Sequence, residues 1–116
     1  MKRRFRLTRS TDFKRVRRSG KSYAHPLVVL YVLKSEHVGV RVGVSAGLAI
    51  GNAVKRNRAK RLLRAAMTGL LGQTVPGSDL LLIARSPLPA ADLLQTRAAL
   101  TNLLGRAGLL TQTNDA

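Results

Sequence analysis

Hydrophobic patterning in the first half of the chain predicts two neighbouring strands. Residues 22–33 are enriched in β-branched and aromatic residues, and 27–33 are almost continuously apolar, which is typical of a strand buried for much of its length. In residues 38–44, valine occupies every second position and alternates with glycine or arginine, so this strand has one buried face. Because only residues 34–37 separate the two strands, we expect an antiparallel hairpin, with room for a further short strand near Tyr23.

The same patterning predicts a short helix before these strands, and a strand followed by a helix near the end of the chain. Ser10 or Thr11 can cap a helix over residues 12–18 through a side-chain oxygen. Residues 79–85 enclose a continuous apolar run, which indicates another buried strand. After a proline-rich break, the last helix runs from about residue 90 to 104.

The longest predicted helix runs from Ala53 to about Leu71, and Asn52 is placed to cap it. At about 100° per residue, one side of this helix collects the apolar residues Ala59, Leu62, Leu63, Ala66, Met67 and Leu70. The other side collects the polar residues Asn57, Lys60, Arg61 and Arg64. The helix is therefore amphipathic, with a cationic outer face.

The order helix, strand, strand, helix, strand, helix predicts an α+β fold, a single-domain sandwich in which helices pack on one sheet. The length of 116 residues suits one domain over residues 1–116, with residues 1–9 as a basic tail and residues 111–116 frayed. No apolar run approaches the roughly 20 residues that span a bilayer, and polar residues interrupt the N-terminus before a signal segment can form. We therefore expect a cytoplasmic protein with no membrane partner.

Net charge points to the kind of partner. The chain has 21 Lys and Arg against 5 Asp and Glu, which gives a formal net charge of +16. Ten of the cations fall in residues 1–21 and six in residues 55–64, whereas the three arginines beyond residue 64 are matched by three aspartates. Because self-repulsion of this size destabilises a compact monomer, the composition predicts a polyanionic partner bound by the first half of the chain.

The run 53–64 is the strongest candidate site. Cations at the N-terminal half of a helix oppose the helix dipole, and a bound anion such as phosphate compensates this. Arginine can bridge phosphate oxygens or stack on a base, and an asparagine among arginines can hydrogen-bond a base edge or a ribose hydroxyl. A solvated, merely solubilising face is the alternative. The candidate residues are Lys55, Arg56, Asn57, Arg58, Lys60, Arg61 and Arg64.

The sequence offers few residues for metal binding or for nucleophilic or acid–base catalysis. The chain has no cysteine, which excludes disulfides, thiol nucleophiles and thiolate metal sites. His25 and His37 have no acidic partner at helical or hairpin spacing, and neither a phosphate-binding loop nor a dinucleotide fingerprint is present. Three of the four aromatic residues are candidates for base stacking, with a core position as the alternative: Phe13, Tyr23 and Tyr31.

The run 51–64, Gly-Asn-Ala-Val-Lys-Arg-Asn-Arg-Ala-Lys-Arg-Leu-Leu-Arg, resembles the signature of the bacterial ribonuclease P protein component family. The Arg-Asn-Arg core at residues 56–58 is its most specific part. Supporting matches are Val42-Gly43-Val44-Ser45, Asp12-Phe13 and Leu30-Tyr31-Val32. The resemblance covers roughly residues 5–105.

This resemblance implies a fold similar to domain 2 of ribosomal protein S5, with a left-handed βαβ crossover. It implies an accessory protein subunit of the endoribonuclease ribonuclease P, in which a catalytic RNA carries the active site and its Mg²⁺ ions and removes the 5′ leader of precursor tRNA. The partners are then the ribonuclease P RNA and precursor tRNA, and no catalytic residue, protein-bound metal or small-molecule substrate is expected.

The resemblance also assigns residues to two surfaces. The surface facing the catalytic RNA comprises Lys55, Arg56, Asn57, Arg58, Lys60, Arg61 and Arg64. The surface receiving the single-stranded leader comprises Phe13, Lys14, Arg17 and Tyr31.

Two positions depart from the family pattern. Leu48-Ala49 stands where the family usually has a Lys-Lys pair, so two cations facing the RNA are missing. Arg17 stands where the family usually has a second aromatic residue, although an arginine can still stack on a base and pair with phosphate.

Three other functions remain as alternatives. A non-enzymatic ribosomal or ribosome-assembly protein would share the basic composition and the small α+β fold. A stand-alone nuclease would need a carboxylate or histidine cluster that the sequence does not show. A DNA-binding module is less well supported, because the long helix has no helix-turn-helix partner.

Overall fold

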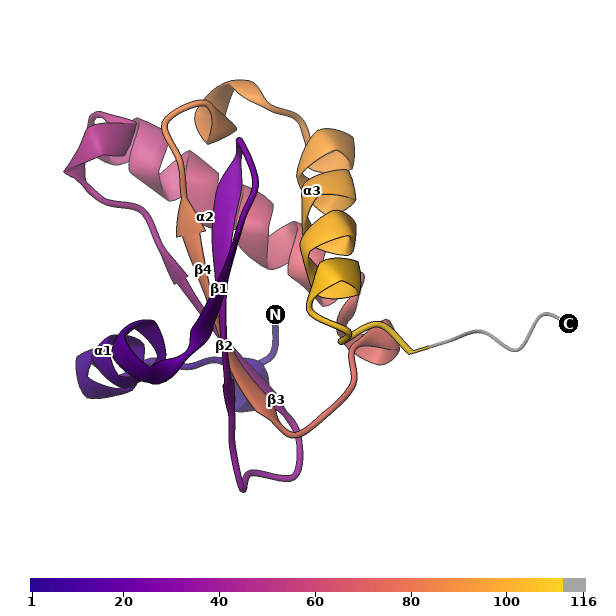
Figure 1. The fold of residues 1–116 in the computed structure, drawn as a ribbon. Helices are drawn as coiled ribbons and strands as arrows, with labels where there is room; N and C mark the ends of the chain where they lie inside the picture. The colour runs from indigo at the N-terminus through magenta and orange to yellow at the C-terminus, as the bar shows by residue number, and fades with distance from the viewer. Residues whose placement is uncertain (112–116) are drawn as a thin grey trace, which may run out of the picture.

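A mixed four-stranded sheet forms the centre of the structure. The computed structural model describes residues 1–111, and its strands lie in the order β1-β2-β4-β3 (Figure 1). The strands are β1 (Lys21–Ala24), β2 (Val28–Lys34), β3 (Val40–Ser45) and β4 (Ser78–Ala84). β2 pairs antiparallel with both β1 and β4, whereas β3 and β4 run parallel, joined by a crossover through the long helix α2 (Ala53–Thr68).

The expected hairpin between residues 22–33 and 38–44 is wrong, because β4 lies between those two segments. Val32 of β2 and Val42 of β3 both pair with Leu80, from opposite sides. β4 is buried along nearly its whole length, so it favours a central position with a neighbour on each edge. The segment 22–33 instead folds on itself as the β1–β2 hairpin.

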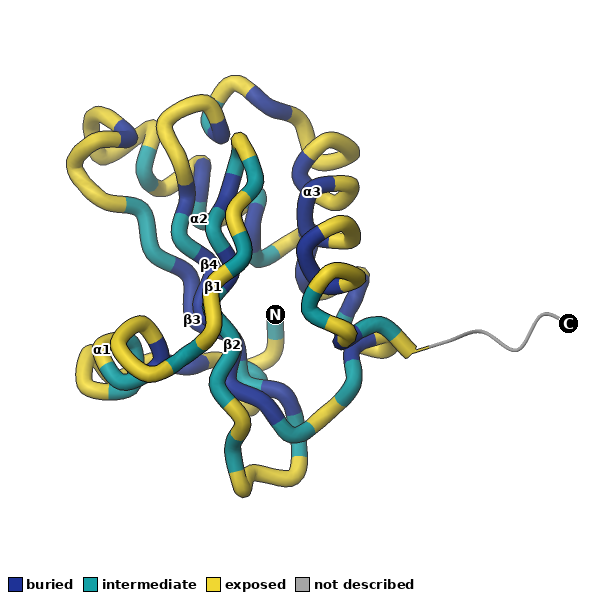
Figure 2. The backbone as a smooth tube through the Cα atoms, in the orientation of Figure 1, coloured by how far each residue is buried: buried dark blue, intermediate teal, exposed yellow. Residues whose placement is uncertain are grey.

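Helices cover both faces of the sheet. α1 (Ser10–Ser19) lies on one face, and α2 and α3 (Leu93–Arg106) lie on the other (Figure 1). Alternate residues of β4 serve the two sides: Leu80 and Leu82 belong to the main core with α2 and α3, whereas Leu81 packs with Val16 of α1. Figure 2 shows α3 buried toward the sheet and exposed outward. The α+β class is confirmed.

Helix starts follow the available caps, with one exception. Asn52 caps α2 as expected, since its Oδ1 accepts the Lys55 N–H at 3.0 Å. α3 begins later than expected because Asp92 and Gln95 form a capping box, and Leu88–Ala90 make a separate 3₁₀ turn, η4. The proposed side-chain cap of α1 is wrong: Ser10 already lies inside the helix, whose first turn closes from the Phe13 N–H to the Arg9 carbonyl.

The N-terminal segment packs against the sheet instead of forming a free tail. The Leu7 N–H donates to the Val42 carbonyl at 2.8 Å, Arg6 forms a parallel bridge with Val42, and Leu7 is only 4% exposed. The segment thus covers the outer edge of β3. At the other end, the Thr111 N–H donates to the Gln73 carbonyl, and the rest of the segment expected to fray, residues 112–116, lies outside the described residues.

Candidate nucleic-acid interface

The outer side of α2 forms a basic surface, here called the α2 face. Its buried side is formed by Ala59, Leu63, Ala66 and Met67, which fixes the rotation of the helix. The expected RNA-facing side chains are accordingly exposed or half-exposed, and α2 contains no acid. The α2 face comprises Lys55, Arg56, Asn57, Arg58, Lys60, Arg61 and Arg64.

Arg58 differs from the rest of the α2 face because its guanidinium is already hydrogen-bonded within the protein. Its Nε donates to the Pro89 carbonyl at 2.7 Å and its Nη2 to the Ala91 carbonyl at 3.1 Å. These bonds tie α2 to the η4 segment. Within residues 1–111, the other side chains of the α2 face make no hydrogen bond to the protein, and so they keep all their donors for a ligand.

A basic hollow lies where the N-terminal segment, β3 and α2 meet. Arg6, Lys60 and Arg64 line it together with Phe13, and its volume is about 260 Å³. Burial lowers the pKa of the Arg64 guanidinium, and the positive charge of Arg6 lowers it further. Since no acid among the described residues lines the hollow, a bound phosphate would relieve this repulsion between like charges.

A second hollow lies between α1 and the sheet, where the leader surface is expected. Phe13, Lys14 and Arg17 line it from α1, and Ser45, Leu81 and Ile83 line it from the strands. Its volume of about 110 Å³ makes it shallow. Tyr31 does not line the hollow itself but packs in the same cluster as Phe13, directly beside Leu81 in the sheet. The structure therefore brings all four expected leader residues to one side of the sheet.

Gly43 is needed for the position of the Phe13 ring, a role that the sequence does not reveal. A Cβ atom at Gly43 would lie 2.7 and 2.8 Å from two ring carbons of Phe13, and such distances require the ring to move. The ring packs on bare backbone of β3 and presents its remaining surface to both hollows. Because Gly43 has no side chain, the Phe13 ring can lie directly against the backbone of β3.

Asp79 anchors α1 to the sheet and is the second residue that sequence reasoning missed. Its side chain is 1% exposed and accepts hydrogen bonds from Arg41 Nε and Nη2 at 3.0 and 2.9 Å, and from Arg15 Nη2 at 2.7 Å. Burial acts to raise the pKa of this carboxyl, but the bonds from Arg41 and Arg15 outweigh it and hold the pKa below its usual value. The buried ion cluster links β3, β4 and α1.

Leu48 and Ala49 form part of a 3₁₀ turn, η2 (Leu48–Ile50), directly before α2. The Leu48 side chain is apolar and 83% exposed to solvent, next to the α2 face. The cationic surface is therefore narrower here than the family pattern implies.

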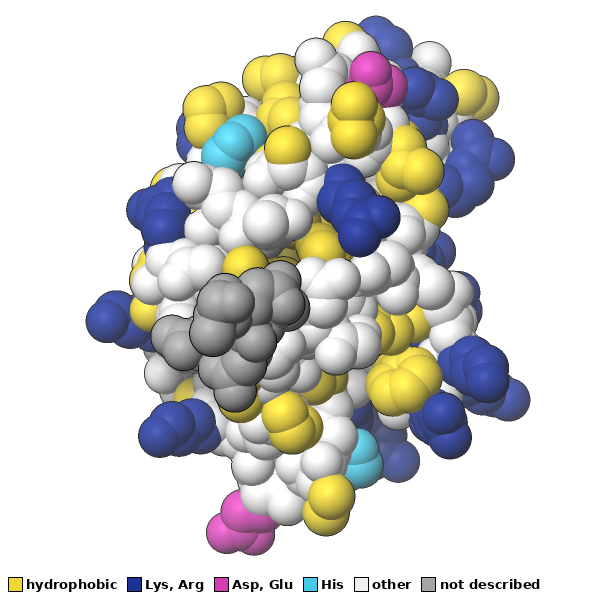
Figure 3. All heavy atoms as spheres, turned by 90° about the vertical axis from the view of Figure 1, so that its right-hand side faces the viewer, with side chains coloured by type: hydrophobic (Ala, Val, Ile, Leu, Met, Phe, Trp, Pro, Cys, Tyr) yellow, Lys and Arg dark blue, Asp and Glu magenta, His cyan; other side chains and the backbone are white. Residues whose placement is uncertain are grey.

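Three further observations concern surface charge, metal binding and membrane spans in the described chain. Figure 3, seen from the α3 side, shows basic side chains mostly toward the edges of that face and uncharged atoms in its middle. Among residues 1–111, no group of three or more His, Cys, Asp or Glu could hold a metal ion. No helix in that range is long and apolar enough to cross a membrane.

Comparisons with known proteins agree with the sequence signature. A family model described as Ribonuclease P matches residues 1–108. The ribonuclease P protein component of Listeria innocua is 37% identical over 113 residues, covering 97% of this chain and 95% of that protein. The counterpart from an Exiguobacterium species is 38% identical over 107 residues, covering 92% of this chain and 93% of that protein.

Solved structures show the same relationship. The Staphylococcus aureus RNase P protein matches with a TM-score of 0.81 and 30% identity, over 92% of this chain and 98% of that one. The Thermotoga maritima RNase P protein matches with a TM-score of 0.78 and 30% identity, over 87% of this chain and 96% of that one. The chain belongs to the ribonuclease P protein component family.

Proposed function

We propose that this chain is the protein subunit of the ribonuclease P ribonucleoprotein and promotes endonucleolytic removal of the 5′ leader from precursor tRNA. In this proposal the RNA subunit performs the cleavage with Mg²⁺ that it binds itself. Family membership supports the proposal, and so does the chemistry of the described residues: their buried acid, Asp79, is fully engaged by Arg15 and Arg41 and cannot act as a base.

The α2 face is the proposed contact with the catalytic RNA. Among residues 1–111 its cations make no salt bridge to an acid, so phosphates are their natural partners. Neutralising phosphates lets two polyanions, the catalytic RNA and the precursor tRNA, approach each other with less Mg²⁺ in solution. Arg58 contributes less than its neighbours, because two of its N–H groups already bind backbone carbonyls.

The hollow between α1 and the sheet is the proposed contact with the leader. A small, partly apolar hollow lined by Phe13, Lys14 and Arg17 suits a single strand, whose bases stack on the Phe13 ring while its phosphates meet the two cations. Arg17 can serve both purposes, because a guanidinium stacks on bases and also pairs with phosphate.

Continuity between the two surfaces is the observation that carries this proposal. Phe13 lines both hollows, and Lys60 and Arg64 of the α2 face line the one next to it. One protein can therefore touch the catalytic RNA with α2 while it holds the leader beside α1.

Binding measurements on the assembled ribonucleoprotein test the proposal. Phe13→Ala should weaken binding of leader-bearing precursor tRNA and leave binding of leaderless tRNA unchanged. Arg56→Ala should weaken assembly with the ribonuclease P RNA, whereas Arg97→Ala, which removes an exposed arginine from α3, should not. Equal effects of Phe13→Ala on both tRNAs, or equal effects of the two arginine changes, would contradict the two-surface proposal.

A further inference from the structure

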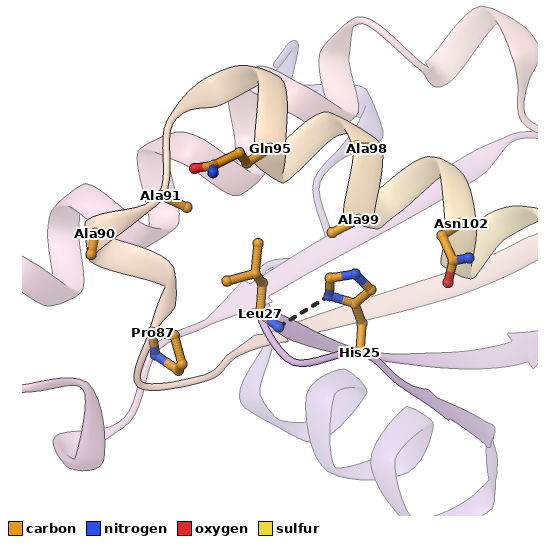
Figure 4. A pocket seen from close by; sticks show the side chains of 9 residues that line it. All are labelled: His25, Leu27, Pro87, Ala90, Ala91, Gln95, Ala98, Ala99 and Asn102. Carbon is orange, nitrogen blue, oxygen red and sulfur yellow. Dashed lines mark hydrogen bonds between the residues drawn. The ribbon is translucent and has the colours of Figure 1, made fainter.

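A cavity lies between the β1–β2 turn and α3, on the side of η4 opposite the N-terminal half of α2. Its volume is about 500 Å³, and it is lined by His25, Leu27, Pro87, Ala90, Ala91, Gln95, Ala98, Ala99 and Asn102. Figure 4 shows α3 along one side, the turn with His25 and Leu27 opposite it, and η4 closing one end. This volume lies within the range of pockets that bind small organic groups.

Small side chains make the cavity a slot. Four of the lining residues are alanines, from η4, from the residue after it and from α3, and their short side chains leave space between the facing elements. Leu27 projects into the space between them (Figure 4). The walls are therefore apolar and suit a flat, uncharged ring.

Polar groups at the rim are arranged to bind such a ring by its edge. The Gln95 Oε1 accepts the Asp92 N–H at 3.0 Å, which leaves both amide N–H groups of Gln95 available. The Asn102 amide makes no hydrogen bond to another residue in the described chain. The His25 Nδ1 accepts the Leu27 N–H at 3.1 Å, so a neutral imidazole carries its proton on Nε2, as a donor.

Two arginines flank the turn that forms one wall. Arg85 Nη1 donates to the His25 carbonyl at 3.3 Å, and Arg106 Nη1 donates to the Ala24 carbonyl at 2.7 Å. Each guanidinium keeps further N–H donors for a phosphate. The nearby carboxylate of Asp92 serves as the cap of α3, because its Oδ1 accepts the Gln95 N–H at 2.7 Å.

From these contacts we propose that the cavity binds an unpaired nucleobase of RNA, with Gln95 and Asn102 hydrogen-bonding the base edge and Arg85 or Arg106 meeting its phosphate. Carboxamides can donate and accept at once, as base edges require, and the alanine slot accepts a ring of either base type. The charges of Arg85 and Arg106 beside the turn favour an anionic nucleotide over a cationic ligand. The site adjoins the α2 face through Arg58, whose Nη2 donates to the Ala91 carbonyl, but none of its lining residues belongs to the two surfaces of the proposed function.

Amide chemical shifts of the full-length protein, titrated with AMP and with ribose 5-phosphate, test this site. Ribose 5-phosphate carries the same phosphate without a base, so it reports binding to basic surfaces alone. AMP should shift the side-chain amides of Gln95 and Asn102 and the backbone amides of Ala98 and Ala99 in a saturable way. Ribose 5-phosphate should leave these four signals unchanged.

Two matched variants of α3 complete the test. Ala98→Leu fills the slot with a good helix former and should weaken AMP binding at these signals at least about fivefold, or about 1 kcal/mol. Thr101→Leu, an exposed position of α3 outside the cavity, should bind AMP as the parent does. Asn102→Ala, which removes an edge partner without filling the slot, should also weaken binding. Equal shifts with ribose 5-phosphate, or unchanged AMP binding by Ala98→Leu, would overturn the assignment.

Discussion

Replacement of Asp79 by Asn tests whether a buried ion cluster holds α1 over the sheet. The change keeps the shape of the side chain and removes the charge that pairs with Arg15 and Arg41. It leaves two guanidinium groups with no ionic partner on the sheet. The hollow between α1 and the sheet should therefore loosen along with the stability of the protein.

The magnitude follows from the three hydrogen bonds to Asp79. Bonds to a charged group contribute about 1.5–3 kcal/mol each, and breaking a buried pair costs about 3–5 kcal/mol in total. Because the side chains of Arg15 and Arg41 are 37% and 30% exposed, water screens part of this energy. We expect a loss of about 2–4 kcal/mol in the free energy of unfolding, or roughly 8–16 °C in melting temperature at about 4 °C per kcal/mol.

Thermal unfolding followed by circular dichroism at neutral pH measures this loss. Glu36→Gln is the matched control, because it also removes one negative charge but from an exposed residue in the β2–β3 loop. The control should melt within about 0.5 kcal/mol of the parent. If Asp79→Asn had the same melting temperature as Glu36→Gln, the ion cluster would not anchor α1 and the reasoning would be wrong.

The same pair of proteins should differ in pH dependence. The pKa of Asp79 is lowered in the folded state, so its stabilisation is present above the unfolded value of about 3.9 and is lost as pH falls through the lower, folded value. The difference in stability between the parent and Asp79→Asn should therefore be full at neutral pH and shrink in acid. A difference that grew in acid would contradict the sign of this shift.

Three further predictions concern the two RNA surfaces. Arg58→Ala should lower the free energy of unfolding in urea by about 1 kcal/mol more than Arg61→Ala, since only Arg58 binds backbone carbonyls; equal losses would refute that tie. Gly43→Ala should displace the Phe13 ring, destabilise the protein by about 1–3 kcal/mol and weaken binding of leader-bearing tRNA more than leaderless tRNA. The slope of log affinity against log salt on structured RNA should be about −5, from roughly six phosphate contacts at about 0.9 each, and a slope near −1 would contradict the α2 face.

Local signals in the sequence were sufficient to predict that the three helices are present and that the cations of α2 face outward, but not where α1 and α3 begin. Asn52 caps α2 and apolar periodicity fixes its buried side, so the outward position of its cations follows from residues close together in sequence. Strand pairing was different. The patterns of β2 and β3 show which faces are buried but not which strand lies between them, and β4 takes that place because it is apolar on both faces.

The residues that sequence reasoning missed act through contacts between distant segments. Asp79 contacts Arg15 and Arg41 only after β3, β4 and α1 have assembled, and no local spacing in the sequence predicts this cluster. Gly43 matters because a ring from another element packs on it. The basic tail predicted over residues 1–9 lies against the sheet, because the Leu7 side chain is buried and its backbone N–H donates to the Val42 carbonyl of β3.

Single-turnover cleavage of a leader-bearing precursor tRNA by a bacterial ribonuclease P RNA at low Mg²⁺, with and without this protein, tests the central claim most directly. The account predicts that the protein restores cleavage, that no cleavage occurs when the RNA is omitted, and that Phe13→Ala loses part of the gain only on leader-bearing substrate. Tight binding of the protein to the RNA with no gain in cleavage would contradict the account.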